Sequence, residues 1–176
     1  RGPTPIQSVI LEGENKTGIT LYLMDEEVDH GPVIAKRELS AVMNKINYED
    51  LEEKLAELSA DLIIETLPKY LSGEIKPEEQ NHQEATFTQK FTTKDSEIDF
   101  NSLEKALEGD SKESENIDRK IRALNPEPGV WTIPNKSSFE YLPKGKRVKL
   151  LGSEIKDGKL VLNKIQVAGK NIKTIN

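Results

Sequence analysis

The residues best suited to catalysis in this sequence are Asp29 and His30, which precede Gly31 in a polar segment between two apolar ones. A carboxylate beside an imidazole suits acid and base chemistry, because each group shifts the pKa of the other. Adjacent loop residues seldom point the same way, however, and acidic loop side chains are mostly only solvated. From these residues alone, a solvated loop and a catalytic loop both stay open.

A second group that could do chemistry is a basic run near the end of the chain. In a strand, its alternation with apolar residues would place several cations on one face. Such a face can contact phosphates without reading base sequence, and Phe139 and Tyr141 nearby could stack on bases. The alternative is a solvated, lysine-rich strand. The basic residues are Lys144, Lys146, Arg147 and Lys149.

Charge is distributed unevenly along the 176 residues. Residues 1–91 carry 9 basic and 18 acidic side chains, whereas residues 92–176 carry 16 and 13. Residues 136–176 alone carry 10 basic and 3 acidic side chains. This asymmetry favours two units with different partners, of which the second would meet a polyanion.

Composition also excludes several classes of site. There is no cysteine and there are only two histidines, so disulfides, a thiol nucleophile and a histidine-rich metal site are excluded. No apolar run approaches the roughly 18 residues that a membrane span needs. We therefore expect a cytoplasmic protein with no metal and no membrane partner.

The spacing of apolar residues divides the first half into elements. It predicts a helix over residues 4–11, strands over residues 18–24 and 33–39 with a loop between them, and a long helix over Tyr48–Leu71. Asn47 has the right side chain and position to be the N-cap of that helix. Beyond it, residues 73–91 lack periodicity, which indicates a linker. The expected domains are residues 1–72 and 92–176.

The second half has shorter signals. They predict a helix over residues 115–124, ended by Asn125-Pro126, and strands over residues 138–142, 147–151 and 159–167. An Asp157-Gly158 pair predicts a hairpin turn before the last strand. The acidic tract over residues 108–115 has the composition of a surface loop. Several short strands with few helices favour a small β-barrel or sandwich.

Two sets of motifs then give the sequence a family resemblance. The first set resembles the second half of the catalytic domain of methionyl-tRNA formyltransferases, in order and in spacing. It comprises Arg1-Gly2-Pro3-Thr4-Pro5-Ile6-Gln7, Gly13, Thr17-Gly18-Ile19-Thr20, Met24-Asp25 and Val28-Asp29-His30-Gly31. The second set resembles the C-terminal domain of these enzymes. It comprises Ile98-Asp99-Phe100, Ile121-Arg122-Ala123-Leu124-Asn125-Pro126-Glu127-Pro128-Gly129, Trp131 and Ala168-Gly169-Lys170.

The resemblance implies an α/β plus β fold: the C-terminal half of a Rossmann-like formyltransferase domain, a linker, and a small OB-like β-barrel that binds tRNA. It implies transfer of a formyl group from 10-formyltetrahydrofolate to the α-amino group of methionyl initiator tRNA, in translation initiation. The expected partners are folate and tRNA, the expected state is a monomer, and the tRNA contacts would be Lys144, Lys146, Arg147 and Lys149.

The resemblance also implies roles for individual residues. The family uses an asparagine, a histidine and an aspartate, of which only the aspartate has a counterpart here, Asp29; His30 is a neighbour and not the missing histidine. The Asp29 carboxylate would orient the histidine and help to move a proton off the incoming amine. The pterin would lie against Met24, Asp25, Glu26, Glu27 and Val28, mainly through their backbone groups. The acceptor pocket would be bounded by Pro5, Ile6 and Gln7, for which helix capping and packing is an equal alternative.

Two departures from the family pattern and two rival functions stay open. The stretch over residues 109–116 is an apparent surface insertion, and the chain looks truncated at both ends, so we expect a fragment that is inactive alone. One rival is a formyltransferase that acts on nucleotide-linked amino sugars, and the other is a nonenzymatic tRNA-binding fragment. The basic C-terminal region favours the tRNA enzyme, because tRNA offers a long phosphate track.

Overall fold

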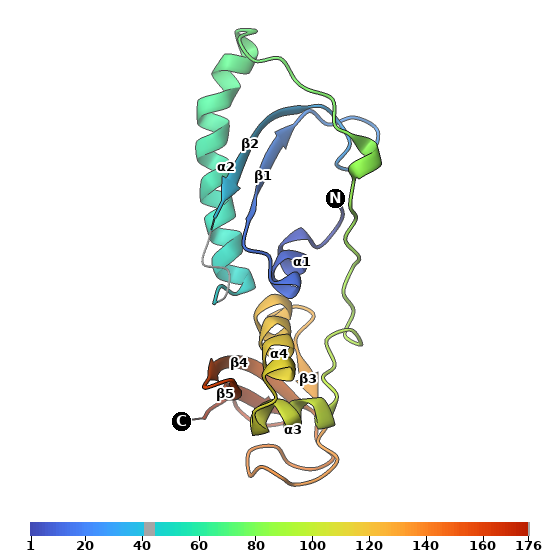
Figure 1. Ribbon diagram of the computed structural model, residues 1–176, viewed down its shortest axis with the longest axis vertical. Coiled ribbons are helices and arrows are strands. Elements are labelled where there is room, and N and C mark those ends of the chain that lie inside the picture. Colours follow the sequence, from blue (N-terminus) through green and yellow to red (C-terminus); the bar gives the residue numbers. More distant parts are fainter. Residues whose placement is uncertain (41–44, 176) are drawn as a thin grey trace. The chain divides into compact units, whose positions relative to one another are not determined.

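A computed structural model describes residues 1–40 and 45–175 of the protein. The chain divides into two compact units, residues 1–90 and residues 91–176 (Figure 1). Within the described residues, no helix has the length and apolar character needed to cross a bilayer.

The first unit is built on a β-hairpin covered by a long helix (Figure 1). β1 (Thr17–Tyr22) and β2 (Val33–Leu39) pair in antiparallel register, from Thr17 opposite Leu39 to Tyr22 opposite Val33. α2 (Tyr48–Leu71) packs along both strands and against α1 (Pro5–Glu12). The side chains that form this core lie at helical spacing, because only one face of each helix meets its neighbours; they are Ile10, Leu51, Leu55 and Leu62.

The sequence-based elements of this unit are confirmed, with small shifts at their ends. α2 has the expected bounds, and the Asn47 side chain caps it by accepting a hydrogen bond from the Asp50 N–H at 2.9 Å. α1 begins at Pro5, whose missing N–H costs nothing in the first turn. The first strand ends earlier than expected, because the Leu23 N–H bonds to the Pro32 carbonyl at 2.9 Å and closes the loop.

The segment after α2, here called the return segment (residues 74–90), is held against the first unit. Val33 and Glu78 exchange two backbone hydrogen bonds of 2.7 and 2.8 Å, and the Thr88 N–H bonds to the Arg1 carbonyl at 2.8 Å. It contains one turn of 3-10 helix, η1 (His82–Glu84). Its lack of periodicity predicts the absence of long elements, but not these isolated contacts with residues distant in sequence.

The second unit is a four-stranded antiparallel sheet packed against two helices. The strand order is β3 (Trp131–Thr132), β4 (Val148–Lys156), β5 (Lys159–Val167) and β6 (Lys173–Thr174). α3 (Phe100–Glu108) packs on β5, and α4 (Ser111–Leu124) packs on β4 and β5. A mixed α/β unit followed by a unit with an antiparallel sheet confirms the expected fold class, while the OB-like barrel stays an expectation.

Two predictions for the second unit are wrong. The acidic tract over residues 108–115 is not a surface loop: α3 ends at Glu108, Gly109 turns the chain with φ 114°, and the Asp110 side chain caps α4. The supposed insertion over residues 109–116 is thus mostly the start of a helix, in which Ser114 is buried and donates to the Ala106 carbonyl. Composition indicated a loop because Asp and Ser favour both loops and helix N-termini.

The strand expected over residues 138–142 is also absent, since these residues form turns. The segment is fixed by side chains instead, with Leu142 fully buried and the Ser138 hydroxyl donating to Glu104 at 2.6 Å. By contrast, the Asp157-Gly158 hairpin is confirmed, because both residues have positive φ, 50° and 78°, as a two-residue hairpin turn requires.

We expect residues 91–176 to fold when they are produced alone. Their helices and sheet bury a common core that includes Leu103, Leu124 and Ile165, and a local core is what an autonomous unit requires. The measurement is thermal unfolding followed by circular dichroism, which should show one cooperative transition. Trypsin should cleave the longer chain first at the exposed Lys90, and earlier cleavage within β4 or β5 would contradict this boundary.

Candidate active site

Asp29 lies in the loop between β1 and β2, and both of its carboxylate oxygens accept hydrogen bonds. The Gly2 N–H donates to Oδ2 at 2.9 Å, and the Tyr22 hydroxyl donates to Oδ1 at 3.0 Å. The Gly2 N–H, with further help from Tyr22 and the Arg1 charge, lowers the pKa of Asp29 below its ordinary value. The hydrogen bond to Asp29 in turn raises the pKa of Tyr22. Asp29 is therefore a fixed negative charge at neutral pH.

The backbone that carries Asp29 has an unusual conformation. Asp29 has φ 54°, in the left-handed region that residues with a Cβ seldom adopt. Two positions later, Gly31 approaches the Leu23 carbonyl so closely that a Cβ there would lie 1.9 Å from the oxygen. The loop is thus narrowed to a tight neck directly behind the carboxylate.

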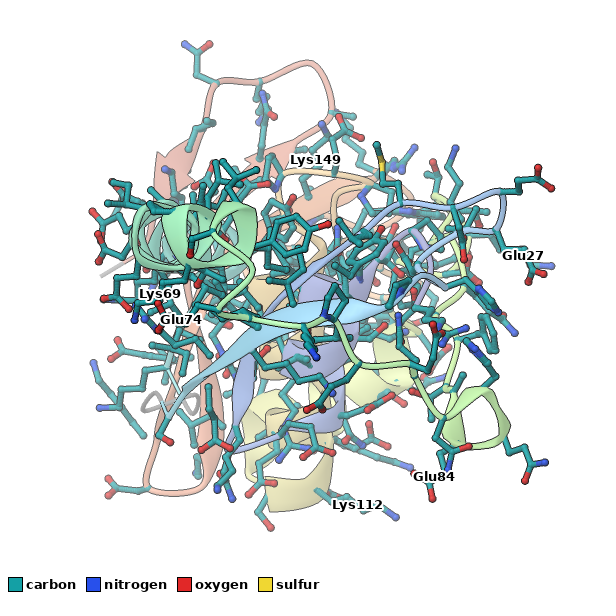
Figure 2. All side chains as sticks on the ribbon, turned by 90° about the horizontal axis from the view of Figure 1, so that it is seen from above. Glu27, Lys69, Glu74, Glu84, Lys112 and Lys149 are labelled. Carbon is teal, nitrogen blue, oxygen red and sulfur yellow. The ribbon has the colours of Figure 1, made fainter. Side chains whose placement is uncertain are left out.

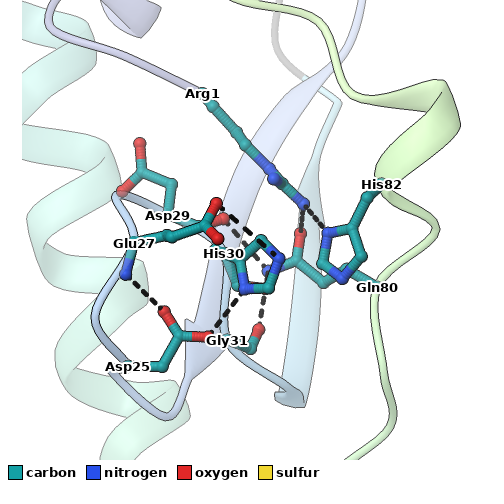
Figure 3. Close-up of polar contacts among 8 residues, drawn as sticks. All are labelled: Arg1, Asp25, Glu27, Asp29, His30, Gly31, Gln80 and His82. Carbon is teal, nitrogen blue, oxygen red and sulfur yellow. Dashed lines mark hydrogen bonds and ion pairs between the residues drawn. The ribbon is translucent and has the colours of Figure 1, made fainter.

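Asp25 and His30 hold the outer part of the loop together, as Figure 3 shows. The Asp25 carboxylate accepts the Glu27 N–H at 3.0 Å, and its other oxygen lies 2.7 Å from His30 Nδ1. His30, assisted by the Glu27 N–H, lowers the pKa of Asp25. The other face of the His30 ring stacks on His82 of the return segment, with centroids 3.8 Å apart. Asp29 and His30 therefore have different partners, although they are adjacent in sequence.

The remaining residues expected to contact the pterin are exposed. Met24 is 89% and Val28 78% exposed, and Figure 2 shows Glu27 at the outer end of its loop, directed away from the ribbon. The backbone groups of Met24, Glu26 and Val28 form no hydrogen bond with any other described residue. Exposed apolar side chains beside free backbone donors and acceptors fit a flat heterocycle that carries several polar atoms.

The residues expected at the acceptor pocket form the first turn of α1. Pro5 is exposed, whereas Ile6 and Gln7 are half-buried. The preceding Thr4 is fixed by the return segment, since its hydroxyl donates to the Gln89 carbonyl at 2.6 Å. The turn therefore follows closely the residue, Gly2, that donates to Asp29.

The four basic residues do not share one strand face as expected. Lys144 and Lys146 lie in a turn before β4, so the expectation is wrong for them. Only Arg147 and Lys149 lie on either side of the buried Val148 and so point the same way. Both contribute to a shallow hollow, which is also lined by Thr93, Pro128, Gln166, Val167, Ala168 and Gly169.

An aromatic side chain completes this basic site. The Arg147 guanidinium lies 4.0 Å from the centroid of the Trp131 ring, and the Trp131 indole N–H donates to the Thr93 carbonyl at 2.8 Å. Phe139 and Tyr141, which the sequence suggested as stacking residues, contact each other instead, with ring centroids 5.8 Å apart.

Sequence reasoning missed three residues of the Asp29 site: Gly2, Tyr22 and Gln80. The alternation along β1 predicts that Tyr22 has one face toward the core, but not that its hydroxyl reaches seven residues onward. Gln80 lies in the predicted linker, about fifty residues from its partners, where no local pattern could identify it. Among the described residues, no group of three His, Cys, Asp or Glu side chains could hold a metal ion.

Comparison with known proteins gives a consistent assignment for both units. Residues 1–67 match the family described as formyl transferase, and residues 90–172 match the formyl transferase C-terminal domain. A methionyl-tRNA formyltransferase of Streptococcus uberis is 36% identical over 140 residues, 80% of this chain. One of Thermotoga neapolitana is 37% identical over 153 residues, 87% of this chain. In both cases the chain spans 42% of the relative's length.

Solved structures resemble the same fold. HypX from Aquifex aeolicus, in complex with tetrahydrofolic acid, superposes with a TM-score of 0.68 and 19% identity, covering 99% of this chain and 31% of that one. An N-formyltransferase from Helicobacter canadensis, in complex with folinic acid and dTDP-3-aminofucose, gives a TM-score of 0.59 and 20% identity, covering 89% and 50%. At these identities the likeness shows the fold alone.

Proposed function

Because the chain belongs to the formyl transferase family, we propose that it acts in the transfer of a formyl group from 10-formyltetrahydrofolate to the α-amino group of methionyl initiator tRNA, in the cytoplasm. The match of both units to relatives with that name, at 36–37% identity, supports this substrate pair. The observation that carries the proposal is Asp29, a carboxylate held by two donors in the loop between β1 and β2.

The charge of Asp29 is its contribution to the reaction. As an amine attacks the formyl carbon it becomes positive, and the carbonyl oxygen becomes an oxyanion. A general base works best with a pKa near the working pH, whereas the pKa of Asp29 is lowered. Asp29 therefore acts mainly as a fixed negative charge that stabilises and orients positive partners, with the proton leaving through a neighbouring group or water.

The loop over residues 24–28 would hold the folate, which supplies the formyl group. The free backbone groups of Met24, Glu26 and Val28 suit the polar edge of a pterin, and the exposed Met24 and Val28 side chains suit its faces. The Asp25 carboxylate is already used within the loop, so its role is to shape the backbone. Pro5, Ile6 and Gln7 would bound the site of the acceptor amine.

The basic residues of the second unit would contact tRNA phosphates. Arg147 and Lys149 line one hollow beside Trp131, which offers an aromatic face as well as two cations. Lys144 and Lys146, in the exposed turn before β4, would extend the contact along the backbone.

Replacing Arg147 and Lys149 together with alanine should weaken tRNA binding and flatten its dependence on salt. Each lost phosphate contact releases about one counterion fewer, so the slope of log K against log salt should fall by about 2. The measurement is tRNA binding by filter retention between low and moderate salt. The matched control replaces Lys156 and Lys159, at the opposite end of the same two strands; an equal change in that control would leave only a general charge effect.

The structural likeness to an enzyme crystallised with a nucleotide-linked amino sugar keeps one rival reaction in view. The two substrates differ in size: a sugar nucleotide needs a small anionic site, whereas tRNA needs an extended basic surface. An assay that offers methionyl-tRNA and dTDP-linked amino sugars separately should show formylation of the tRNA. Formylation of the sugar alone would transfer the function to the rival, and no formylation of either would favour a nonenzymatic tRNA-binding protein.

A further inference from the structure

One side chain of the return segment contacts the backbone of the Asp29 loop at three consecutive residues. The Gln80 amide nitrogen, Nε2, lies 3.1, 3.0 and 2.7 Å from the carbonyl oxygens of Asp29, His30 and Gly31 (Figure 3). Gln80 is half-buried, and its backbone lies next to the two-bond bridge between Glu78 and Val33. The amide is therefore presented to the loop from a fixed position.

The orientation of the Gln80 amide follows from the chemistry of its partners. The Arg1 guanidinium donates to the amide oxygen, Oε1, at 2.9 Å. A guanidinium can only donate and a backbone carbonyl can only accept, so the oxygen must face Arg1 and the nitrogen must face the loop. Arg1 also contacts His82 at 3.1 Å, and His82 stacks on His30.

The loop needs such a donor because its backbone is unfavourable without one. Asp29 has a left-handed φ of 54°, and three successive carbonyl oxygens converge on one point. Their dipoles repel one another unless a donor lies among them, and an isolated left-handed residue with a Cβ is disfavoured. The same backbone determines where the Asp29 carboxylate points.

We propose that Gln80 is a positioning residue for the Asp29 carboxylate, because its amide holds the three carbonyl oxygens that set the loop conformation. The proposal rests on the proposed function, in that Asp29 must act in formyl transfer for Gln80 to affect the rate. It assigns a catalytic task to the return segment, which the sequence indicated only as a linker.

Two substitutions separate the carbonyl contacts from the Arg1 contact. Gln80→Met keeps the length and shape of the side chain but removes both the donor and the acceptor. Gln80→Glu keeps an acceptor for Arg1 and removes the donor to the loop. Gln83→Glu and Gln83→Met are matched controls, since Gln83 is exposed in the same segment and a glutamate there adds the same charge.

Both Gln80 variants should lower kcat by about 10- to 100-fold in the protein as its gene encodes it, because a displacement of about 1 Å can cost that much. The KM for methionyl-tRNA should change by less than about threefold, since binding groups are untouched. The controls should stay within about twofold of the unmodified rate. The carbonyl ¹³C resonances of residues 29–31 should shift in both Gln80 variants, while the melting temperature is recorded to detect unfolding.

The outcomes distinguish this proposal from the proposed function. If Gln80→Met keeps its kcat while Asp29→Asn loses it, the positioning role is wrong and the function stands. If Gln80→Glu is active and only Gln80→Met is impaired, the Arg1 contact matters and the carbonyl contacts do not. If the unmodified protein forms no formyl-methionyl-tRNA, the proposed function fails. Unchanged carbonyl resonances in the Gln80 variants would overturn the positioning role independently of any activity.

Discussion

The Asp29→Asn variant should lose about 10²–10⁴ in the rate of methionyl-tRNA formylation, the usual contribution of a positioned acid or base group. Asparagine has nearly the size of aspartate and tolerates the left-handed backbone at this position equally well. The substitution therefore removes the negative charge and leaves the loop in place. Single-turnover kinetics with saturating tRNA measure this loss, and tRNA affinity should change little.

The pH dependence of the unmodified enzyme follows from the same site. The Gly2 N–H and the Tyr22 hydroxyl stabilise the ionised form, so the pKa of Asp29 is lowered. The Asp29 charge is therefore present at neutral pH, and it is lost only as the pH falls through that lowered pKa. Asp29→Asn should accordingly reduce the rate at all pH values above the ordinary carboxyl range.

His30→Ala is the control for this prediction, because it changes the neighbouring loop residue. It removes the contact with Asp25 and the stack on His82, but Asp29 keeps both donors. We expect the formylation rate to fall by less than about tenfold, as is usual for a residue that supports a loop. A severe loss in His30→Ala together with a mild one in Asp29→Asn would mean that the catalytic role belongs to His30.

How much of the fold could be predicted depends on how local its signals are. α2 was predicted with its bounds and its Asn47 cap, because leucines at helical spacing and a capping side chain are both local. The β5 strand and its Asp157-Gly158 turn were predicted for the same reason. α3 was missed, since its buried Phe100, Leu103 and Ala106 give only three apolar positions in nine residues.

The candidate site was less predictable, because its contacts join residues far apart in the chain. The family resemblance indicated Asp29, but not the Tyr22 and Gly2 groups that fix its charge. For the basic run, alternation correctly paired Arg147 with Lys149 and wrongly extended the strand to Lys144, because Gly145 turns the chain there with φ 73°.

The neck of the Asp29 loop gives the second large expected effect. In Gly31→Ala the new Cβ would lie 1.9 Å from the Leu23 carbonyl oxygen, far inside van der Waals contact. The obstacle is backbone, and the Leu23 N–H is held by Pro32 at 2.9 Å, so no side-chain rotation can relieve the clash. The two sides of the neck must separate, and Asp29 moves with one of them.

A shift of about 1 Å at a catalytic group can cost about 10²-fold, so Gly31→Ala should lower kcat by at least that factor. Steady-state formylation assays measure the loss, and exchange of the Leu23 amide proton should accelerate as its bond to Pro32 weakens. The control is Gly73→Ala, where a Cβ meets nothing within 4 Å and only the φ of +79° is unfavourable. That variant should lose about 1 kcal/mol of stability and keep its rate; a Gly31→Ala enzyme with full activity would show that the neck does not position Asp29.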